Sequence, residues 1–562
     1  MSLFEDILRA RSLVGEKRDS FLNPKYNNGH DPFKLPDMDK AVERLVSARE
    51  RQEYITIYGD YDIDGLTATT VLLDAFEGFG FKYVEAYIPN RFIEGYGLTV
   101  EAVETIAATG ANLIVTVDCG SLSTKEITRA NELGVEVIVT DHHNVLKVQP
   151  PAVAVINPKR QLDEHPGLYE NYVLKNPKKH VNLYPFLDLP GVGVAFKLVQ
   201  ALQTRLDGLA DGQEKWLLDL VGLGTVCDVV TLQDENRMHV YYGLRVMQKT
   251  RRPGLKALMM VAGVELGSVN ARNLGFQLGP RMNASGRLDT ARYSLDMLRA
   301  ADGMVALDKA QQLDAMNMER RKEQDRIFKE AIVQAEKFIK NKVLVVSSEN
   351  WSHGIIGIVA AKLLEKYKKP AFVLEEMGDE SKGSARSYGD FSAADAIRAS
   401  DDIITKGGGH KLAAGVTLPT ENIVAFRKRV NEFYKSLNLR NQTDKLLPSA
   451  DVAIDNLDEV TEDLVVQLAQ LEPFGNGNPE PVLRLDHVLV TNMRRMGSDS
   501  QHVKLQIQDI NNNRIELLAF NADEKWFVEP GGYVDVWFEP NVNEWNGNKT
   551  VEGRLMRLEL VA

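Results

Sequence analysis

Three short apolar segments of this chain each run directly into a cluster of acidic or imidazole side chains, and this pattern restricts the fold most. Residues 54–58 (YITIY) precede GDYDIDG at 59–65, residues 113–117 (LIVTV) precede DCG at 118–120, and residues 135–140 (VEVIVT) precede DHH at 141–143. Helical patterns separate these segments, and such alternation is typical of a doubly wound parallel sheet. Ligands of such sheets bind beyond the carboxyl ends of the strands, so we expect the clusters to converge on one crevice.

The clusters have a structural and a chemical interpretation. An acid after a strand is often only a helix N-cap or a turn residue. Three clusters in succession, at the spacing of a sheet, favour a shared site, for which Asp228 in TVCDVV is a further candidate. Crowded carboxylates repel one another unless cations neutralise them. Oxygen and imidazole ligands suit Mn²⁺ or Mg²⁺, and a pair of such ions would activate water for in-line attack on phosphorus.

Other classes of site lack their motifs in this sequence. No GxxxxGK[ST] phosphate loop occurs, and Gly191-Val192-Gly193 lacks the rest of a dinucleotide fingerprint and is expected only to open a helix. Cys119 and Cys227 form neither a CxxC motif nor a disulfide framework. No apolar run reaches the roughly 18 residues of a membrane helix, and the first residues lack a signal-peptide core. The sequence therefore predicts a cytoplasmic protein that does not contact a membrane.

The pattern of elements divides the 562 residues into several parts. A segment with almost no Gly or Pro predicts a long connecting helix. A second alternation of strands and helices follows it, and the last segment alternates apolar and polar residues in short runs, as in a small antiparallel barrel or sandwich. The expected parts are a helical preamble at 1–50, a catalytic α/β domain at 51–292, the connecting helix at 293–341, a smaller α/β domain at 342–436 and a barrel at 437–562.

Charge is distributed unevenly along the chain. The formal net charge is −12, and residues 441–562 hold 10 Lys and Arg against 21 Asp and Glu, which leaves −1 for the other 440 residues. An acidic balance argues against a nucleic-acid partner, whose phosphates normally require a basic surface. A near-neutral body can still contain a local basic groove, so net charge leaves this question open. The acidic barrel is expected to bind DNA weakly at most, and to shape a channel or dock a partner.

The motifs also carry a family resemblance. GDYDIDG, VDCG, TDHH and GTVCDVV resemble, in this order, the four motifs of the DHH phosphoesterase superfamily. Further segments, across nearly the whole chain, are similar to the RecJ family of bacterial exonucleases: IPNRFIEGYG, LGPRMNASGRLD, SHGIIGIVAAKL, GSARS and GGGHKLAAG. The resemblance implies an α/β fold with a parallel-sheet DHH catalytic domain, a long connecting helix, a smaller α/β DHH-associated domain and a C-terminal antiparallel OB-type β-barrel. It also implies a monomer.

The same resemblance implies a set of metal ligands and a catalytic histidine. His143 would face the scissile phosphate, where it would stabilise charge or protonate the leaving oxygen, and Asp118 would bridge two Mn²⁺ or Mg²⁺ ions. A histidine stands four positions before the paired acids in the wider superfamily. Tyr58 holds that place here, and Asp60 is the candidate to compensate. The implied ligands are Asp62, Asp64, Asp118, His142 and Asp228.

A second group of residues matches family positions that hold DNA. Backbone N–H groups of GGGH could contact an anion, and arginines could pair with phosphates as bidentate forks. An isolated arginine is more often a solvated surface residue, and His353 could equally cap or pack at the start of its helix. The implied DNA-binding residues are Arg91, Arg281, Arg287, His353, Ser384, Arg386 and His410.

By resemblance, the chain would be a metal-dependent 5′→3′ exonuclease that degrades single-stranded DNA with a 5′ phosphate to mononucleotides, in DNA repair and recombination. A single-strand-binding protein or a helicase would be its partner. Two alternatives stay open. One is a DHH phosphodiesterase for short oligoribonucleotides or cyclic dinucleotides, and the other is a DNA-binding scaffold without activity. Every expected ligand after Tyr58 is present, which favours an enzyme.

Overall fold

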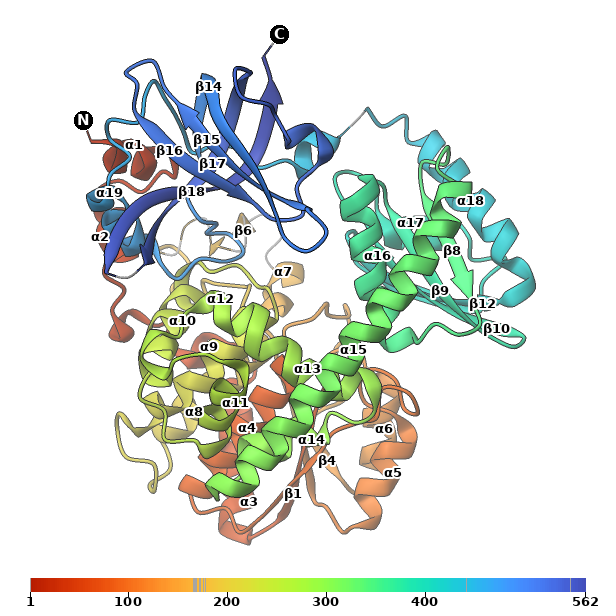
Figure 1. Cartoon of the computed structure of the whole chain (residues 1–562). Coiled ribbons are helices and arrows are strands. Elements are labelled where there is room, and N and C mark those ends of the chain that lie inside the picture. The colour runs from red at the N-terminus through yellow and green to blue at the C-terminus, as the bar shows by residue number, and fades with distance from the viewer. Residues whose placement is uncertain are drawn as a thin grey trace.

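The computed structural model describes residues 2–561 apart from 165–168, 171, 172, 175, 177, 441 and 546. The chain forms a large α/β lobe, a smaller α/β lobe at the far end of the long helix α15, and a β-barrel (Figure 1). The N-terminus lies beside this barrel, far from the smaller lobe. No helix among these described residues is both long enough and apolar enough to cross a membrane.

The large lobe is built on a parallel sheet with the strand order β2-β1-β3-β4-β5. The apolar segments that precede the acidic clusters form its central strands, and their side chains are almost all buried. Strand β1 has β2 as its neighbour on one side and β3 on the other, so the direction of the chain through the sheet reverses at β1. A crevice opens at such a switch point. The strands are β1 (Tyr54–Gly59), β2 (Tyr83–Tyr87), β3 (Leu113–Val117), β4 (Glu136–Thr140) and β5 (Ala154–Ile156).

Strand register brings the ends of these strands to one level. Gly59 pairs with Val117, Val117 with Thr140, and Thr140 with Ile156. The residues that follow these pairs therefore leave the sheet along the same edge: Asp60, Asp118, Asp141 and Asn157.

Helices cover both faces of the sheet because successive strand residues point to opposite sides. Ile57 packs into the core under α4 and α8, whereas Tyr58 packs into the core under α5 and α6. The helices of this lobe are α3 (Met38–Arg51), α4 (Ile63–Gly78), α5 (Val100–Ala108), α6 (Thr124–Glu132), α7 (Gln161–Glu164), α8 (Gly191–Gln203), α9 (Leu218–Cys227), α10 (Asp234–Met247), α11 (Pro253–Ala262), α12 (Ala271–Asn273), α13 (Gly279–Leu288) and α14 (Arg292–Arg299). A small hairpin joins β6 (Tyr169–Glu170) to β7 (Val173–Leu174).

Helix α15 (Gly303–Lys337) is 35 residues long and connects the two α/β lobes. Its N-cap is Asp302, whose carboxylate accepts hydrogen bonds from the backbone N–H groups of Met304 and Val305. The helix packs against α11, α13 and α14 in the large lobe and against α16 in the smaller one. The helix lies within residues 293–341, the segment predicted as the connecting helix.

The smaller lobe contains a mixed sheet with the order β11-β12-β10-β9-β8, in which only the β8–β9 pair of the described strands is parallel. The Gly-rich motifs lie on β10 and β11. Its elements are β8 (Leu344–Ser348), α16 (His353–Tyr367), β9 (Ala371–Met377), β10 (Glu380–Arg386), α17 (Ala393–Arg398), β11 (Lys406–Gly409), β12 (Ala413–Pro419) and α18 (Ile423–Ser436).

The C-terminal part is a barrel with the order β13-β14-β15-β16-β18-β17, closed by a further pairing of β14 with β17. Alternate residues of β15 and β16 face its core, as the period of the sequence predicts. Its elements are β13 (Val452–Ile454), α19 (Glu462–Leu468), β14 (Leu483–Met496), β15 (His502–Gln508), β16 (Arg514–Ala519), β17 (Tyr533–Trp545) and β18 (Asn548–Leu560).

The segment predicted as one helical preamble divides between two cores. Helix α1 (Leu3–Ala10) buries Leu3, Phe4, Ile7 and Leu8 in the core of the barrel, and α2 (Gly15–Leu22) adds its last residues to the same core. Helix α3 instead packs in the large lobe. The sequence predicted a helical preamble here but could not divide it between two partners.

Candidate active site

The first acidic cluster begins helix α4. Asp62 is its N-cap, and its carboxylate accepts hydrogen bonds from the backbone N–H groups of Asp64 and Gly65 at 2.9 and 3.2 Å. A Cβ on Gly65 would lie 2.5 Å from the carbonyl oxygen of Asp60, so only glycine permits this close turn. Asp62 is therefore a helix N-cap, as the structural interpretation of the cluster predicted. Its cluster nevertheless faces the crevice.

Asp64 and Asp118 are held by the start of helix α8. The backbone N–H groups of Gly191 and Val192 donate to the Asp64 carboxylate at 2.6 and 2.8 Å. A Cβ on Gly191 would lie 2.6 Å from Cβ of Asp118, which adopts a left-handed backbone with φ of 62°. Gly191-Val192 thus opens a helix, as predicted, and also fixes two of the acids.

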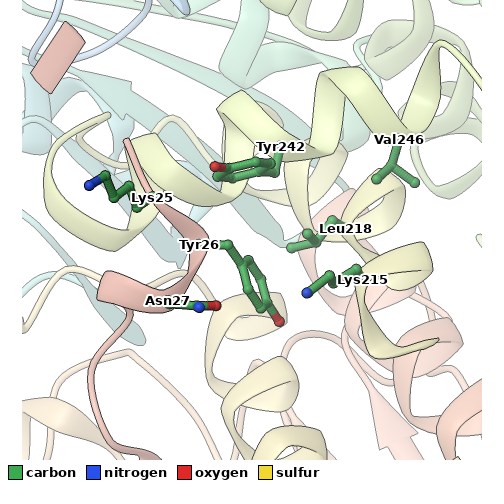
Figure 2. Close-up of a pocket in the computed structure, with 7 residues that line it drawn as sticks. All are labelled: Lys25, Tyr26, Asn27, Lys215, Leu218, Tyr242 and Val246. Carbon is green, nitrogen blue, oxygen red and sulfur yellow. The ribbon is translucent and has the colours of Figure 1, made fainter. Parts of the chain in front are cut away.

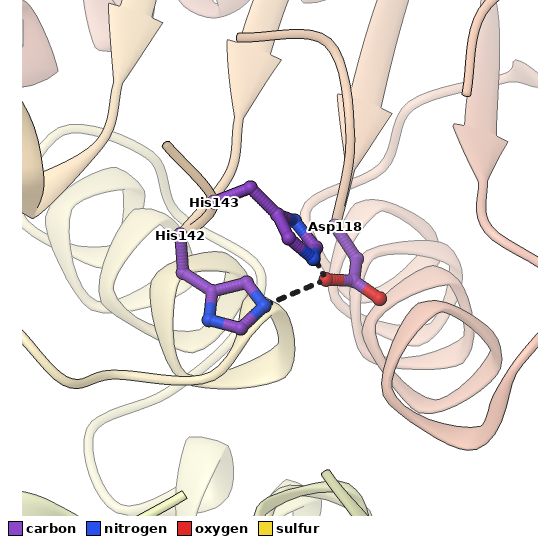
Figure 3. Close-up of side chains that lie close together, drawn as sticks. All are labelled: Asp118, His142 and His143. Atoms are coloured by element: carbon purple, nitrogen blue, oxygen red, sulfur yellow. Dashed lines mark ion pairs between the residues drawn. The ribbon is translucent and has the colours of Figure 1, made fainter. Parts of the chain in front are cut away.

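The third cluster brings both histidines toward Asp118 (Figure 3). His142 Nε2 lies 3.1 Å from Asp118 Oδ1 and 3.8 Å from one carboxylate oxygen each of Asp64 and Asp228. His143 Nδ1 lies 3.8 Å from the same Asp118 oxygen. The implied ligands from β1, β3, β4 and the end of α9 therefore meet in one place.

Several polar atoms of this cluster are buried without a hydrogen-bond partner in the described part of the chain: Asp60 Oδ1, Asp118 Oδ1, His142 Nε2 and Asp228 Oδ2. Buried polar groups are normally paired, so this set requires an explanation. Carboxylate and imidazole atoms near one another fit a metal ion, and three overlapping groups of the described residues have that spacing. They are Asp118 with His142 and His143, Asp64 with His142 and Asp228, and Asp60 with Asp62 and Asp118.

The acids repel one another strongly where they lie. Burial raises the pKa of Asp60, Asp118 and Asp228 well above the ordinary value, and the charges of neighbouring carboxylates raise it further. Burial and the charge of Asp62 raise the pKa of Asp64 to about 7. Burial and the neighbouring His143 lower the pKa of His142 well below its usual range, so its imidazole is neutral and able to bind a cation.

Asp141 orients the third cluster. Its carboxylate accepts hydrogen bonds from the backbone N–H groups of His142 and His143 at 2.7 and 3.1 Å and contacts His143 Nδ1 at 2.8 Å. Burial opposes a charged His143 imidazole, but the hydrogen bond and charge of Asp141 outweigh burial and raise the pKa of His143. His143 thus retains a proton more readily than His142. The hydroxyl of Tyr96 lies 3.1 Å from His143 Nδ1.

Tyr58 does not belong to the acidic cluster. Its ring is fully buried and stacks on Tyr87, and its hydroxyl donates to the carbonyl oxygen of Gly97 at 2.8 Å. Asp60, two residues later, lies instead within reach of Asp62 and Asp118. This placement fits the compensating role suggested for Asp60.

A cluster of arginines lies on the side of the acids nearest Asp60 and Asp62. Burial, together with the charges of Arg91, Arg320 and Arg386, lowers the pKa of Arg287 to about 9. We call Arg91, Arg287, Arg320 and Arg386 the arginine cluster. None of its members forms an ion pair within 4.0 Å in the described part of the chain.

Local contacts hold the members of the arginine cluster in position. Arg91 lies over the ring of Tyr61, 4.1 Å from its centroid, and Arg386 Nη1 donates to Ser384 Oγ at 3.3 Å. Arg287 Nη1 donates to the carbonyl oxygen of Gly354 at 3.0 Å, which joins the large lobe to the start of α16. Ser384, Arg386 and Arg91 from the predicted set are therefore brought together.

The other predicted DNA contacts have different surroundings. Arg281 pairs with Asp314 on α15 at 2.8 Å and donates to the carbonyl oxygen of Gln277. His353 Nδ1 contacts Glu375 at 2.6 Å, while its Nε2 is buried without a partner among the described residues. His410 follows β11, and burial lowers its pKa, as do the charges of His143 and Lys159. His410 thus lies opposite the third cluster, whereas Arg281 is already paired.

Three residues near the site were missed by the sequence interpretation. Asp141 was recognised at a strand end but given no role, although its position before two histidines was a usable signal. Arg320 on α15 and Lys159 after β5 reach the site only through the tertiary fold. Their sequence context offers no comparable signal.

A cavity of about 470 Å³ lies elsewhere in the large lobe (Figure 2). The rings of Tyr26 and Tyr242 meet edge to face in its wall, with centroids 6.0 Å apart, and Lys215 lies 4.7 Å from the centroid of Tyr26. Its described lining is Lys25, Tyr26, Asn27, Lys215, Leu218, Tyr242 and Val246, which includes no carboxylate. The cavity shares no residue with the acidic cluster and takes no part in its chemistry.

Family models match three parts of the chain. The model described as the DHH family, N-terminal domain, matches residues 54–225, the DHHA1 domain matches residues 340–436, and the RecJ OB domain matches residues 451–556. These matches follow the large lobe, the smaller lobe and the barrel in order, and they confirm the predicted fold class.

Two curated relatives cover most of the chain. The single-stranded-DNA-specific exonuclease RecJ of Bacillus subtilis is 36% identical over 542 residues, which are 95% of this chain. This chain spans 65% of the length of that relative, slightly less than two thirds. The protein of the same name from Escherichia coli is 32% identical, over 92% of this chain and 89% of that protein.

A solved structure supports the same relationship. RecJ from Thermus thermophilus in complex with Mn²⁺ is similar over 100% of this chain and 78% of its own, with a TM-score of 0.81 at 27% identity. The Mg²⁺ complex of the same protein matches with a TM-score of 0.76.

Proposed function

This chain belongs to the RecJ family of DHH-domain exonucleases, and from that premise we propose that it is a metal-dependent exonuclease acting on single-stranded DNA. It removes mononucleotides in the 5′→3′ direction, in DNA repair and recombination. One observation carries the proposal: buried carboxylates and an imidazole without partners lie beside arginines without acidic partners in the described structure. A metal-bound phosphodiester would supply a cation for the carboxylates and an anion for the arginines together.

The metal ligands are Asp62, Asp64, Asp118, His142 and Asp228, with Asp60 as an additional one. The buried unpaired atoms of Asp60, Asp118, His142 and Asp228 fit Mn²⁺ or Mg²⁺ by the chemistry of the donor set. When bound, the ions neutralise the carboxylates and activate water for attack on the phosphodiester. Asp118 belongs to two of the three groups with ligand spacing, so it would be the residue shared by both ions.

Polarity follows from the position of the arginine cluster. Arg386 and Ser384 lie on β10 of the smaller lobe, and Arg91 and Arg287 belong to the large lobe. We assign the 5′-terminal phosphate to this cluster, because bidentate arginines suit a terminal phosphate. The first internal phosphodiester then reaches the metal ligands, so one nucleotide is released at a time.

His143 acts on the scissile group. Its hydrogen bond to Asp141 keeps a proton on the imidazole and points the ring toward Asp118. A protonated imidazole there stabilises negative charge on the phosphate and can protonate the leaving oxygen. Backbone N–H groups of the GGGH segment, His353 and His410 are assigned to the DNA backbone, as is Arg281 despite its contact with Asp314.

The setting of the enzyme forms part of the same proposal. The substrate is single-stranded DNA with a 5′ phosphate, and the protein partner is a single-strand-binding protein or a helicase. The protein acts as a cytoplasmic monomer. We assign the domains to the ranges expected from the sequence, although α1 and α2 contribute to the barrel core and α3 and α14 to the core of the large lobe.

The test uses single-stranded DNA with different labels at its 5′ and 3′ ends. The full chain is incubated with Mn²⁺, Mg²⁺ or a chelator, beside the Asp118→Ala variant. Immediate release of the 5′ label as a mononucleotide, lost with chelator and in the variant, is the expected result. An intact strand together with hydrolysis of a linear or cyclic dinucleotide would instead indicate the small-substrate enzyme, which the matched relatives do not favour.

A further inference from the structure

Lys159 follows β5, which lies at the opposite edge of the parallel sheet from β2, the strand that precedes Arg91 of the arginine cluster. It belongs to the short turn Pro158–Arg160 that follows β5. Asn157, at the end of β5, accepts a hydrogen bond from the backbone N–H of Lys159 at 2.9 Å. The side-chain amide of Asn157 also donates to the carbonyl oxygen of His143 at 3.0 Å. The turn that carries Lys159 is thus fastened directly to the third cluster.

The ammonium group of Lys159 acts on the site from this position. Its charge helps to lower the pKa of His142 and His410 and opposes the rise in the pKa of His143, Asp188 and Asp228. These residues come from both α/β lobes. Strand β5 neighbours β4 in the sheet, with Ile156 level with Thr140, so Lys159 lies just beyond the sheet edge from which the third cluster leaves.

Lys159 and its neighbour Arg160 have different partners. Arg160 pairs with Asp37 at 2.5 Å and donates to the carbonyl oxygen of Val155, so its charge is used within the fold. Lys159 forms no ion pair within 4.0 Å in the described part of the chain, although its side chain is partly buried. A partly buried cation without a partner is costly unless an anion approaches it.

Two cationic regions therefore flank the metal ligands. Arg91 follows β2 at one edge of the sheet and its charge acts on Asp60, while the charge of Asp62 only partly offsets the repulsion around Arg287. Lys159 instead acts on Asp228 and Asp188 at the other side. A strand held by its 5′ phosphate at the arginine cluster and cut at the metal ligands would continue toward Lys159.

We propose that Lys159 binds the phosphodiester that follows the scissile bond on its 3′ side. This subsite rests on the proposed exonuclease function and extends it by one nucleotide. A lysine suits the role because its ammonium attracts a backbone phosphate as a point charge without reading the base. The subsite favours strands of three or more nucleotides over a dinucleotide.

The test compares two substrates that differ by one phosphate. A 5′-phosphorylated thymidine dinucleotide has the terminal and the scissile phosphates only, whereas the trinucleotide adds the phosphate assigned to Lys159. The full chain with Mn²⁺ is expected to cleave the first bond of the trinucleotide with roughly tenfold higher kcat/KM. Lys159→Ala is expected to lose that gain and to keep its rate on the dinucleotide. Lys147→Ala, which removes an exposed lysine from the preceding loop, should resemble the unchanged protein on both substrates.

A trinucleotide with an uncharged methylphosphonate at the second linkage completes a double-mutant cycle. With this substrate, kcat/KM of the unchanged protein should fall about as much as Lys159→Ala lowers it on the natural trinucleotide. In the Lys159→Ala variant the methylphosphonate should lower kcat/KM no further. The proposal would be overturned if the methylphosphonate lowered kcat/KM equally in the unchanged protein and in Lys159→Ala. It would also be overturned if Lys159→Ala lowered kcat/KM equally on the dinucleotide and the trinucleotide. Lys159→Arg, which keeps the charge, should retain most of the gain. If the unchanged protein cleaves no strand at all, the exonuclease function itself fails, which is a distinct result.

Discussion

The active site contains two groups of crowded, buried charges, the acids and the arginine cluster, and the two groups differ in whether they can lose their charge. On one side, burial and mutual repulsion raise the pKa of Asp60, Asp64, Asp118 and Asp228, so these carboxylates can take up protons. On the other side, Arg287 keeps a pKa of about 9 even in the arginine cluster. The acids can relieve their repulsion by protonation near neutral pH, whereas the arginines stay charged.

This difference indicates how each side binds its ligand. A metal ion must displace protons from the acids, so its affinity depends on pH. Phosphate binding at the arginines displaces no protons, so its affinity depends mainly on the salt concentration. Binding at the two sides can therefore be separated experimentally.

The largest effect is expected for Asp118→Ala, which removes the carboxylate that lies within reach of both histidines and of Asp60 and Asp62. Several kcal/mol of electrostatic stabilisation are lost with a metal site, so kcat/KM on 5′-phosphorylated single-stranded DNA should fall by roughly 10³-fold or more. Steady-state rates at saturating Mn²⁺ measure this. Asp39→Ala, an acid in the first turn of α3, is the control. If kcat/KM of the variant stays within tenfold of that of the unchanged protein, Asp118 is not a metal ligand.

Arg386→Ala should have the next largest effect and should depend on the 5′ end. Loss of a charge-assisted contact costs roughly 10- to 100-fold in kcat/KM on a strand with a 5′ phosphate. On a strand with a 5′ hydroxyl the same variant should differ little from the unchanged protein. Parallel assays on both strands check this, and an equal loss on the two strands would mean that Arg386 does not bind the terminal phosphate.

Metal binding should weaken as pH falls below 7. The folded-state pKa of Asp64 is about 7, above its ordinary 3.8, so the metal-free fold binds more protons than the unfolded chain between these values. Stability of the metal-free protein therefore falls as pH rises through this window. If one proton is displaced, Mn²⁺ affinity should change by about tenfold per pH unit below 7. Calorimetric titrations at pH 5.5, 6.5 and 7.5, and the shift in Tm with Mn²⁺, measure both effects; a pH-independent affinity would contradict the raised pKa.

The smallest effect is expected for Arg281→Ala. Arg281 already pairs with Asp314, and a partly exposed ion pair stabilises a fold by only about 0–1 kcal/mol. Even if Arg281 also contacts DNA, kcat/KM should fall by less than about threefold, because the contact must compete with Asp314. The assay is that used for Arg386→Ala. A loss as large as that of Arg386→Ala would place Arg281 in the arginine cluster.

The acidic side could be predicted from the sequence because the position of each acid depends on local structure. A strand predicted from its apolar run ends at Gly59, Val117 or Thr140, and the acids follow at once. Parallel register then brings them together without further information. The local motif also predicted that Gly191 opens a helix, but not that this turn fixes Asp64 and Asp118.

The cationic side could not be assembled in the same way. Arg320 comes from a helix whose partners depend on packing between lobes, and Lys159 follows a strand whose end bears no acid. Arg281 and Arg287 lie six residues apart on α13, yet one pairs with Asp314 and the other lies free of acidic partners in the described structure. Tertiary contacts, which a motif does not record, decide between these outcomes.

Helix α1 shares the core of a barrel whose strands are synthesised long after it. Its first backbone N–H, that of Leu3, donates to Glu459, 456 positions later. At about 5–20 residues per second, this helix waits roughly 20–90 s on the ribosome before its partner exists. The barrel domain therefore completes its assembly only when two segments that lie far apart in the sequence meet.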